Sequence, residues 1–340
     1  MLSADLQQQI IQQLGEQTDA KDWVINGPVI EARECILYKA SSATYPPAIA
    51  IKVYRDRKKR KNNTMPQYAA LERFAPLLNG DDSEYRVPVA YGSFPEQRTF
   101  LMEWVDAPSL EHRLWRYCYH QGRQQHGMRR TFGWLRAFHE QADHEVKPAN
   151  INRYKNRLQQ CIERHEGEFL LVKNAVFHTG LACITNLAGQ FEALNVAHAR
   201  LHGDFTPSNM LIGNDAVTAI DIAGAQLLPV AEDICLQLSY IAIGYPNMLT
   251  RGDMKKPPSQ WPLLAVILEA YGYPQDEQQR CFLLYVFLYQ LLRRWAVIES
   301  RNKERRTPLV DRWRLRNSAM IVAGVCRTLD KTCHQNGNRS

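Results

Sequence analysis

Among the polar side chains of residues 201–224, three are of the kind and at the spacings that suit phosphoryl transfer. Asp204 follows a His-Gly pair, Asn209 comes five residues later, and Asp221 comes twelve residues after Asn209. Carboxylate and amide oxygens are the ligands that hard divalent cations such as Mg2+ prefer in proteins. We therefore expect this stretch to hold a divalent cation, with Asp204 standing beside it.

Two short apolar runs, at residues 210–212 and 216–220, separate Asn209 from Asp221. Each run is long enough for a strand, and the Gly-Asn-Asp triplet between them is typical of a tight hairpin turn. A hairpin places Asn209 just before its first strand and Asp221 at the end of its second. The amide and the carboxylate would then lie at the same edge.

The chain before this stretch has the pattern of a β-sheet. Candidate strands lie at residues 23–30, 35–40 and 48–54, and the third is apolar except for Lys52 and its last residue. A buried lysine costs several kcal/mol unless it meets an anion. Either Lys52 meets such an anion, or its stem lies along an edge strand while its amine reaches water.

A helix is predicted after the third strand. Thr64 is a candidate N-cap, and Gln67 would close a capping box with it. The helix runs over residues 67–78, and Glu72 borders its apolar face. Glu72 is either a surface glutamate or the ion-pair partner of Lys52.

Two more strands, at residues 87–91 and 98–105, precede a largely helical remainder. The basic and aromatic residues of 110–140 favour two amphipathic helices over a surface that binds single-stranded nucleic acid. His139, near the end of that segment, is interpreted as a hydrogen-bonded packing residue rather than a ligand. Helices are also predicted over residues 150–200, and further ones at 232–243 and in 261–300.

Composition limits the class of protein. The 340 residues predict two domains, and 45% apolar with 23% charged residues is typical of a globular chain. Eight cysteines without a C-x-x-C pair indicate a reduced, cytoplasmic compartment. We expect no signal peptide, because the N-terminus lacks a positive region followed by an apolar stretch. We expect no transmembrane segment, because the longest apolar run covers only residues 281–289. The net charge of +7 favours anionic partners in general.

Taken together, the order of these features resembles a protein-kinase-like fold. The loop H-G-D-F-T-P-S-N is similar to the H-G-D-x-x-x-x-N pattern of the aminoglycoside phosphotransferase and choline kinase branch. The likeness covers roughly residues 20–245. It implies an α+β, bilobal fold with a β-rich, nucleotide-binding N-lobe at residues 1–105 and a largely helical C-lobe at residues 106–340.

The resemblance assigns nucleotide-binding roles to residues of the first lobe. Lys52 would hold the α- and β-phosphates of ATP, and Glu72 would orient Lys52. Met102 would stand at the back of the adenine pocket. The backbone of Glu103 and Val105 would bond the adenine edge.

The same resemblance assigns the chemistry to the central stretch. Asp204 would accept the proton of the substrate hydroxyl or orient that hydroxyl toward the γ-phosphate. Asn209 and Asp221 would hold Mg2+ together with phosphates and water. Asp233 either braces the catalytic loop or is a simple acidic residue at a helix N-terminus.

Three departures from the family pattern refine the prediction. The glycine-rich phosphate loop is missing, since the segment between the first two strands has only Gly27. The D-F-G triplet becomes Asp221-Ile222-Ala223-Gly224, which keeps the metal-binding carboxylate. Gly203 replaces the arginine that usually pairs with a phosphorylated activation loop, so we expect activity without such phosphorylation and a metabolite or glycan substrate.

Charge favours an acceptor that is not a polycation. Residues 291–340 carry twelve Lys/Arg and four Asp/Glu, so a neutral or anionic hydroxyl compound fits better than an aminoglycoside, unless these arginines lie on an outer face. The basic run Arg55 to Lys61 is either a solvated loop or a contact for phosphates, nucleic acid or an anionic membrane.

The sequence therefore predicts an ATP- and Mg2+-dependent phosphotransferase that acts on a small molecule such as a sugar, a metabolite or a glycolipid. A protein Ser/Thr kinase and a pseudokinase that serves as a binding module remain as alternatives. Peripheral contact with a membrane stays open, and nucleic acid is the less favoured partner.

Overall fold

The computed structural model describes residues 2–32, 34–55, 64–80, 83–164, 174–224, 226–245, 248–274, 276–304 and 309–337. The chain folds into two compact units. The first comprises Met1–Pro108 and Asn209–Ala225, and the second comprises Ser109–Ser208 and Gln226–Ser340. The division into lobes at residue 105 stays a prediction. The structural first unit also takes in Asn209–Ala225, because strand pairing ties that segment to it.

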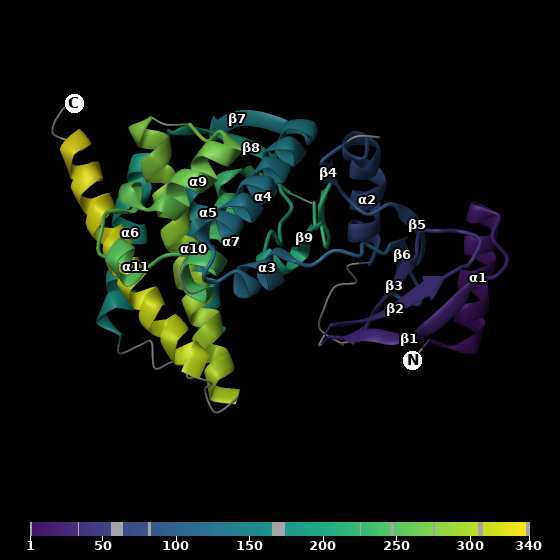
Figure 1. The fold of residues 1–340 in the computed structure, drawn as a ribbon. Helices are drawn as coiled ribbons and strands as arrows, with labels where there is room; N and C mark the ends of the chain where they lie inside the picture. The colour runs from purple at the N-terminus through teal and green to yellow at the C-terminus, as the bar shows by residue number, and fades with distance from the viewer. Residues whose placement is uncertain are drawn as a thin grey trace. The chain divides into compact units, whose positions relative to one another are not determined.

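The first unit is built on a five-stranded antiparallel sheet in the order β1-β2-β3-β6-β5 (Figure 1). Its strands are β1 (Val24–Glu31), β2 (Cys35–Ser41), β3 (Ile49–Tyr54), β5 (Ala90–Phe94) and β6 (Thr99–Glu103). The apolar runs predicted as the first three strands are confirmed. β3 lies in the middle of this order, so Lys52 is not on an edge strand.

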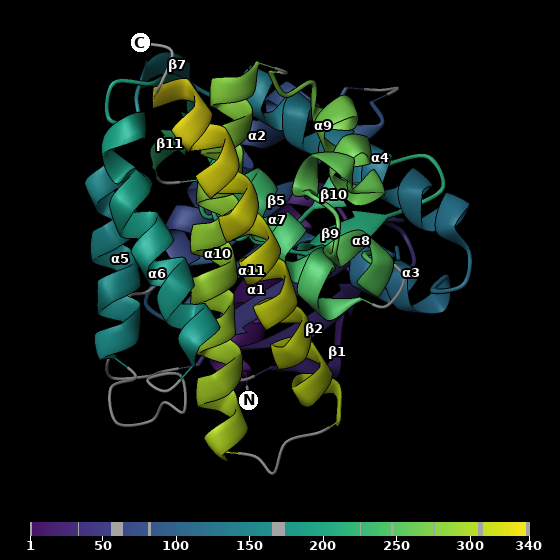
Figure 2. The same cartoon turned by 90° about the vertical axis from the view of Figure 1, so that its left-hand side faces the viewer.

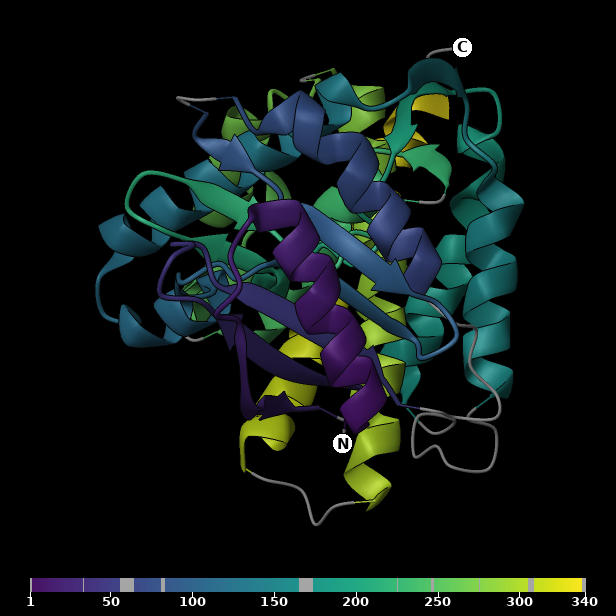
Figure 3. The same cartoon turned by 90° about the vertical axis from the view of Figure 1, so that its right-hand side faces the viewer.

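Two helices flank this sheet. Leu6, Ile10 and Leu14 of α1 (Ala4–Thr18) pack with Tyr38, Ile49 and Ile51 of the sheet. Figure 3 views the fold with the ribbon of α1 at the front. Successive side chains of a strand point to opposite faces, so Lys52 points away from α1. On that other face lies α2 (Thr64–Leu78), which contacts β5 and β6.

A small three-stranded sheet, ordered β4-β10-β9, completes the first unit. β9 (Met210–Ile212) and β10 (Val217–Ala219) form the predicted antiparallel hairpin. β4 (Tyr85–Arg86) pairs with β10 in parallel. The single strand predicted at residues 87–91 is wrong. The chain leaves β4 before Pro88, which has no N–H to donate to a ladder, and joins the large sheet only at Ala90.

The second unit is a helical body around one buried helix. α10 contacts α5, α6, α7 and α11, which surround it in Figure 2. The helices are α3 (Leu110–Arg116), α4 (Gln121–Gln141), α5 (Ile151–Glu163), α6 (Ala175–Leu187), α7 (Ala231–Gly244), α8 (Arg251–Met254), α9 (Pro262–Tyr271), α10 (Glu277–Glu304) and α11 (Leu309–Gly337). Short 3-10 turns lie at η2 (Ala188–Phe191), η3 (Pro207–Asn209) and η4 (Pro258–Gln260).

α10 is long and strongly apolar. Within the described residues it is the one helix whose length and composition over Glu277–Ser300 would suffice to cross a membrane, and 83% of its apolar window is buried inside the fold. Phe282, Tyr285 and Tyr289 on it are fully buried. α10 is therefore accounted for as the core helix of this unit.

A second three-stranded sheet, ordered β11-β8-β7, joins the helical body. It consists of β7 (His144–Pro148), β8 (Asn195–Arg200) and β11 (Leu227–Pro229). The prediction of helix throughout residues 150–200 is wrong at its end, because β8 finds partners on both of its sides. β8 runs directly into the loop that carries Asp204.

Candidate active site

Asn209 and Asp221 lie at one edge of the hairpin, as predicted. Met210 pairs with Ala219, and the N–H of Ile220 donates to the carbonyl oxygen of Asn209 at 2.9 Å. Asn209 is buried, whereas the side chain of Asp221 is 29% exposed. The hairpin therefore brings an amide and a partly open carboxylate to the same end of two short strands.

The backbone at Asp221 is unusual. Its φ angle is +62°, in the left-handed region that non-glycine residues adopt at a cost of about 1 kcal/mol or more. Two of the three residues after it, Ile222 and Gly224, are buried, and a Cβ at Gly224 would lie 3.4 Å from Ala70 of α2. The turn after β10 is thus held against α2, and this aims the Asp221 carboxylate.

Lys52 of β3 forms an ion pair with Asp221. The lysine side chain is only 4% exposed, so an anionic partner is needed to offset its desolvation. Burial acts to lower the pKa of Lys52, but the attraction of Asp221 outweighs it and raises the pKa above its ordinary value. Lys52 is therefore a buried cation whose charge Asp221 maintains.

The helix partner of Lys52 is Gln67, not Glu72. The amide oxygen of Gln67 accepts from Lys52 Nζ at 3.3 Å and from the hydroxyl of Tyr54. In the described part of the chain no ion pair joins Lys52 to Glu72, which is exposed and hydrogen-bonded to Tyr68. Five residues along a helix turn the side chain by about 140°, so Glu72 points away from Lys52.

Nothing local in the sequence marks Gln67 for this role, because its partner lies on another element. The sequence instead predicts that the Gln67 side chain closes a capping box with Thr64. Tyr54 was likewise missed. Burial raises the pKa of its hydroxyl to about 12, so the hydroxyl keeps its proton and donates to Gln67.

The predicted adenine-binding segment follows β6. Met102 is buried and pairs with Ala50 of β3. The N–H of Glu103 donates to Val89 O at 2.8 Å, so it is already used in the sheet. The carbonyl oxygen of Glu103 and the N–H of Val105 are the remaining main-chain groups of the predicted hinge that would meet an adenine edge. Their role stays a prediction, as does the covering of the phosphates. Arg55 bonds Glu31 at 3.0 Å, and the rest of the basic run lies outside the described residues.

Asp204 lies in the second unit, on an exposed turn built by its neighbours. Gly203 has a φ angle of +84°, which glycine adopts without strain. The N–H of Asp204 donates to Nδ1 of His202 at 3.3 Å. The His202 ring is fully buried against Trp134 and Phe205. The turn thus exposes Asp204 while anchoring the residues beside it.

Asp233 braces this turn, which settles the alternative that the sequence left open. Its carboxylate accepts from the N–H of His202 at 2.7 Å and from the N–H of Gly203 at 3.1 Å. Asp233 is 1% exposed at the start of α7. A buried carboxylate that bonds two consecutive backbone N–H groups fixes the local conformation strongly.

His139 and Tyr271 complete the brace. His139 Nε2 lies 3.2 Å from Asp233 Oδ2, and its Nδ1 lies 2.9 Å from the hydroxyl of Tyr271. Burial, and then the charge of Asp233, raise the pKa of Tyr271, so its hydroxyl stays protonated and donates to Nδ1. Nε2–H then donates to Asp233. The interpretation of His139 as a hydrogen-bonded packing residue is confirmed.

The donor set at the hairpin edge suits a hard cation better than zinc. No group of three or more His, Cys, Asp and Glu side chains among the described residues is arranged to hold a metal ion. Asn209 and Asp221 supply oxygens alone, and Mg2+ typically takes one or two protein ligands with phosphates and water completing its shell. The residues present therefore fit Mg2+ that arrives with a nucleotide.

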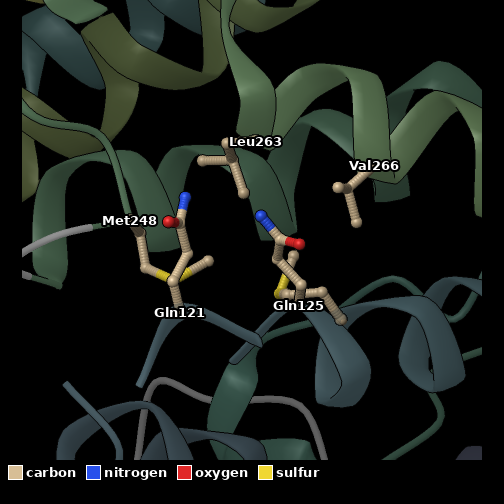
Figure 4. Close-up of a pocket in the computed structure, with 6 residues that line it drawn as sticks. Gln121, Gln125, Met248, Leu263 and Val266 are labelled. Carbon is tan, nitrogen blue, oxygen red and sulfur yellow. The ribbon is translucent and has the colours of Figure 1, made fainter. Parts of the chain in front are cut away.

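A separate small pocket lies within the second unit (Figure 4). It is lined by Gln121, Gln125, Met128, Met248, Leu263 and Val266. None of these side chains ionises, so the pocket offers no acid, base or counter-charge for phosphoryl transfer. The chemistry predicted from the sequence lies elsewhere.

Comparisons with known proteins decide the fold. No family model matches the sequence, and no curated protein matches it either. Among solved structures, a candidate aminoglycoside phosphotransferase from Ralstonia eutropha aligns with a TM-score of 0.59 at 10% identity, over 95% of this chain and 98% of its own. Choline kinase from Cryptosporidium parvum aligns with a TM-score of 0.54 at 12% identity, over 97% of both chains.

The chain has the fold of aminoglycoside phosphotransferases and choline kinases. Amicoumacin kinase, whose structure contains AMP-PNP, Ca2+ and its substrate, also aligns, with a TM-score of 0.54 at 10% identity over 89% of this chain and 87% of its own. The predicted kinase-like fold, with a β-rich first part and a largely helical second part, is confirmed. At these identities the likeness concerns the fold, and the roles of residues rest on the local geometry.

Proposed function

We propose that the protein is an ATP- and Mg2+-dependent phosphotransferase that moves the γ-phosphate of ATP to a hydroxyl of a small molecule. The observation that carries this proposal is the buried Lys52, paired with Asp221 at the hairpin edge that also holds Asn209, in a kinase-like fold. A buried lysine that can exchange a carboxylate for phosphate oxygens suits nucleotide binding.

The first unit would bind and orient the nucleotide. Lys52 would hold the α- and β-phosphates, with Gln67 positioning its ammonium group. Met102, Glu103 and Val105 would receive the adenine. Because Lys52 and Asp221 form an ion pair, nucleotide binding would replace that one pair by two contacts, Lys52 with phosphate and Asp221 with the metal.

Mg2+ would neutralise the charge on the β- and γ-phosphates, and Asn209 and Asp221 would supply its protein ligands. The acceptor hydroxyl oxygen forms a bond to the γ-phosphorus while the bond from that phosphorus to the β–γ bridging oxygen breaks. ADP leaves with the electron pair of that bond. Asp204 would accept or orient the hydroxyl proton, held in place by the Asp233 brace on His202 and Gly203.

Other proteins of this fold support small-molecule acceptors. The structural neighbours include choline and ethanolamine kinases and an amicoumacin kinase complexed with AMP-PNP and Ca2+. The acceptor proposed here is a sugar, a metabolite or a glycolipid, neutral or anionic in charge. A cytoplasmic location suits the free cysteines of the described chain.

The test is to incubate the purified protein with γ-labelled ATP, Mg2+ and a fractionated metabolite extract, and to follow the label. We expect label to move into small molecules. Label on protein substrates would instead favour the protein Ser/Thr kinase, and Mg-ATP binding without any transfer would favour the pseudokinase.

Asp204→Asn provides the matched control, because it keeps the shape of the side chain but cannot accept a proton. Transfer should fall by about a hundredfold or more while Mg-ATP still stabilises the protein against heat. Transfer that persists at the wild-type rate in this variant would remove Asp204 from the mechanism.

A further inference from the structure

Five side chains of the second unit form a group that the proposed chemistry does not use. We call it the arginine–tyrosine cluster. Its members are Glu111 of α3, Tyr240 of α7, Tyr245 at the end of α7, Arg294 of α10 and Arg314 of α11. The helices α7, α10 and α11 contact one another, and Figure 2 shows α10 and α11 crossing in front of α7.

Arg294 is the centre of the cluster. The carbon of its guanidinium lies 3.4 Å from the centroid of the Tyr240 ring. Its Nε is buried without a hydrogen-bond partner, and no carboxylate of the described chain lies within ion-pair distance of it. The side chain as a whole is half-buried, and a partly desolvated arginine gains from a nearby anion. Arg294 thus lacks the anion that such a site calls for.

Arg314 adds a second positive charge. It pairs with Asp311 at 3.2 Å on its own helix, and its Nε is also buried without a partner. Burial lowers the pKa of Arg294, Tyr240 opposes this, and the like charge of Arg314 lowers it further. Both arginines also counteract the raised pKa of the Tyr245 hydroxyl, which donates to Glu111 at 3.2 Å. The two guanidinium groups therefore lie within electrostatic reach of the same tyrosine.

The cluster lies on the side of α7 that carries the brace of the Asp204 turn. Asp233 and Tyr240 are seven residues apart, which in a helix means nearly the same side and about 10 Å along the axis. Leu236 and Tyr240, one turn apart, are the only residues of α7 that are not buried. Asp233, which braces the Asp204 turn, and Tyr240, which stacks on Arg294, therefore lie along one side of α7. Their separation of about 10 Å along the axis is comparable to the length of a small molecule.

We propose that the arginine–tyrosine cluster binds an anionic group of the phosphate acceptor, so that the substrate is a hydroxyl compound that already carries a phosphate or a carboxylate. This inference rests on the proposed function. The forks of Arg294 and Arg314 match the paired oxygens of such an anion. Trp115, which is 40% exposed beside Tyr245, provides a surface for the carbon skeleton. Arg294, whose charge no carboxylate of the described chain pairs, would disfavour choline and aminoglycosides at this end of the site, whereas Arg314 is already paired with Asp311.

The first experiment measures acceptor kinetics. Sugar monophosphates, hydroxy-carboxylates and the matching neutral sugars are offered to the wild type, Arg294→Met, Arg314→Gln and the control Arg312→Gln. Arg312 lies on the same helix as Arg314 but is exposed. Arg312→Gln therefore removes the same charge as Arg314→Gln without changing the cluster. We expect turnover of an anionic acceptor whose KM rises about tenfold to a hundredfold in the first two variants. The KM for ATP should not change, and the control should behave as the wild type.

The phosphate and carboxylate arms identify which anion the cluster accepts. A neutral or cationic acceptor used equally well by the wild type and by both cluster variants overturns the inference. So does a control variant that loses as much as Arg294→Met. If Arg294→Met does not fold, the acceptor KM of Arg314→Gln, a change at a half-buried position, is compared with that of Arg312→Gln in the same way.

A binding measurement separates this inference from the proposed function. In a Lys52→Met background, where the proposed nucleotide site has lost its lysine, inorganic phosphate at constant ionic strength should raise the melting temperature, and adding Arg294→Met should abolish that rise. If Mg-ATP fails to stabilise the wild type while this phosphate effect persists, the proposed function fails and the anion site stands. If Mg-ATP stabilises the wild type but Arg294→Met leaves the phosphate effect unchanged, the anion site fails alone.

Discussion

Lys52 and Asp221 depend on each other at the level of single residues. The lysine is almost fully buried, and its carboxylate partner is held by a left-handed backbone at the end of β10. The ion pair satisfies the charge of both groups. With a nucleotide, the same two side chains would turn to phosphate and metal.

The first prediction concerns this pair. Asp221→Ala should lower the free energy of unfolding by about 2 kcal/mol, because Lys52 is left buried and unpaired while the partial exposure of Asp221 reduces the loss. The double variant Lys52→Met/Asp221→Ala should recover most of that stability in urea unfolding. A double variant that is less stable than either single one would mean that the pair does not account for the burial of Lys52.

The candidate site residues differ in how well they could be predicted from the sequence. Asn209 and Asp221 lie at the two ends of one short hairpin, so their spacing alone indicated that these two lie together. The place of Asp204 beside them stays a prediction. Gln67 was missed because its contact with Lys52 joins a helix to a strand fifteen residues earlier. Glu72 was assigned by family pattern, and the rotation of α2 places it elsewhere.

The orientation of α2 gives the second prediction. Gln67→Ala removes the hydrogen bonds to Lys52 and Tyr54, so the KM for ATP should rise about threefold to tenfold. Glu72→Ala on the same helix serves as the matched control and should leave the KM for ATP nearly unchanged. The reverse order of effects would show that Glu72 reaches Lys52 when nucleotide binds.

α7 connects the Asp204 turn to the helical core, and Asp233 at its start makes that connection. Asp233→Asn should lower the free energy of unfolding by about 2 kcal/mol, because two backbone N–H groups and His139 lose a charged acceptor. Turnover should fall while the KM for ATP stays constant, because Asp233 positions the turn without touching the nucleotide. The control is Glu192→Gln, which removes a negative charge from an exposed residue of the same unit. A rise in the KM for ATP without a loss of turnover would contradict the positioning role.

Elements with strong apolar patterns were predictable, and those defined by pairing were not. The first three strands and the 261–300 helices have local patterns that survive in the structure. β8 was taken for helix because its short run alternates too weakly, and only its two partners, β7 and β11, make it a strand. The break at Pro88 was missed because two different sheets meet on either side of it.

At the scale of the whole molecule, stability should depend on pH through His198. This histidine is 3% exposed in β8, and its Nδ1 lies 2.9 Å from Val196 O. Burial lowers its pKa below the ordinary value of 6.5, despite the opposing bond to Val196. The unfolded chain therefore takes up a proton that the folded chain resists, and stability should fall as the pH drops below 6.5.

The measurement is the urea midpoint at about pH 7.5 and about pH 5.5, for the wild type and for His198→Gln. The wild type should lose more stability between these two conditions than the variant does. Equal losses would assign the acid sensitivity to other groups.

The proposed phosphotransferase activity requires that this chain binds a nucleotide through a metal held at the hairpin edge. Calorimetric titration with AMP-PNP, with and without Mg2+, tests it most directly in the wild type and in Asp221→Ala. We expect the wild type to bind AMP-PNP only with Mg2+ and the variant to bind it about thirtyfold more weakly or worse. A wild type that binds no AMP-PNP in the presence of Mg2+, or an Asp221→Ala protein that binds it as tightly as the wild type, would contradict the claim.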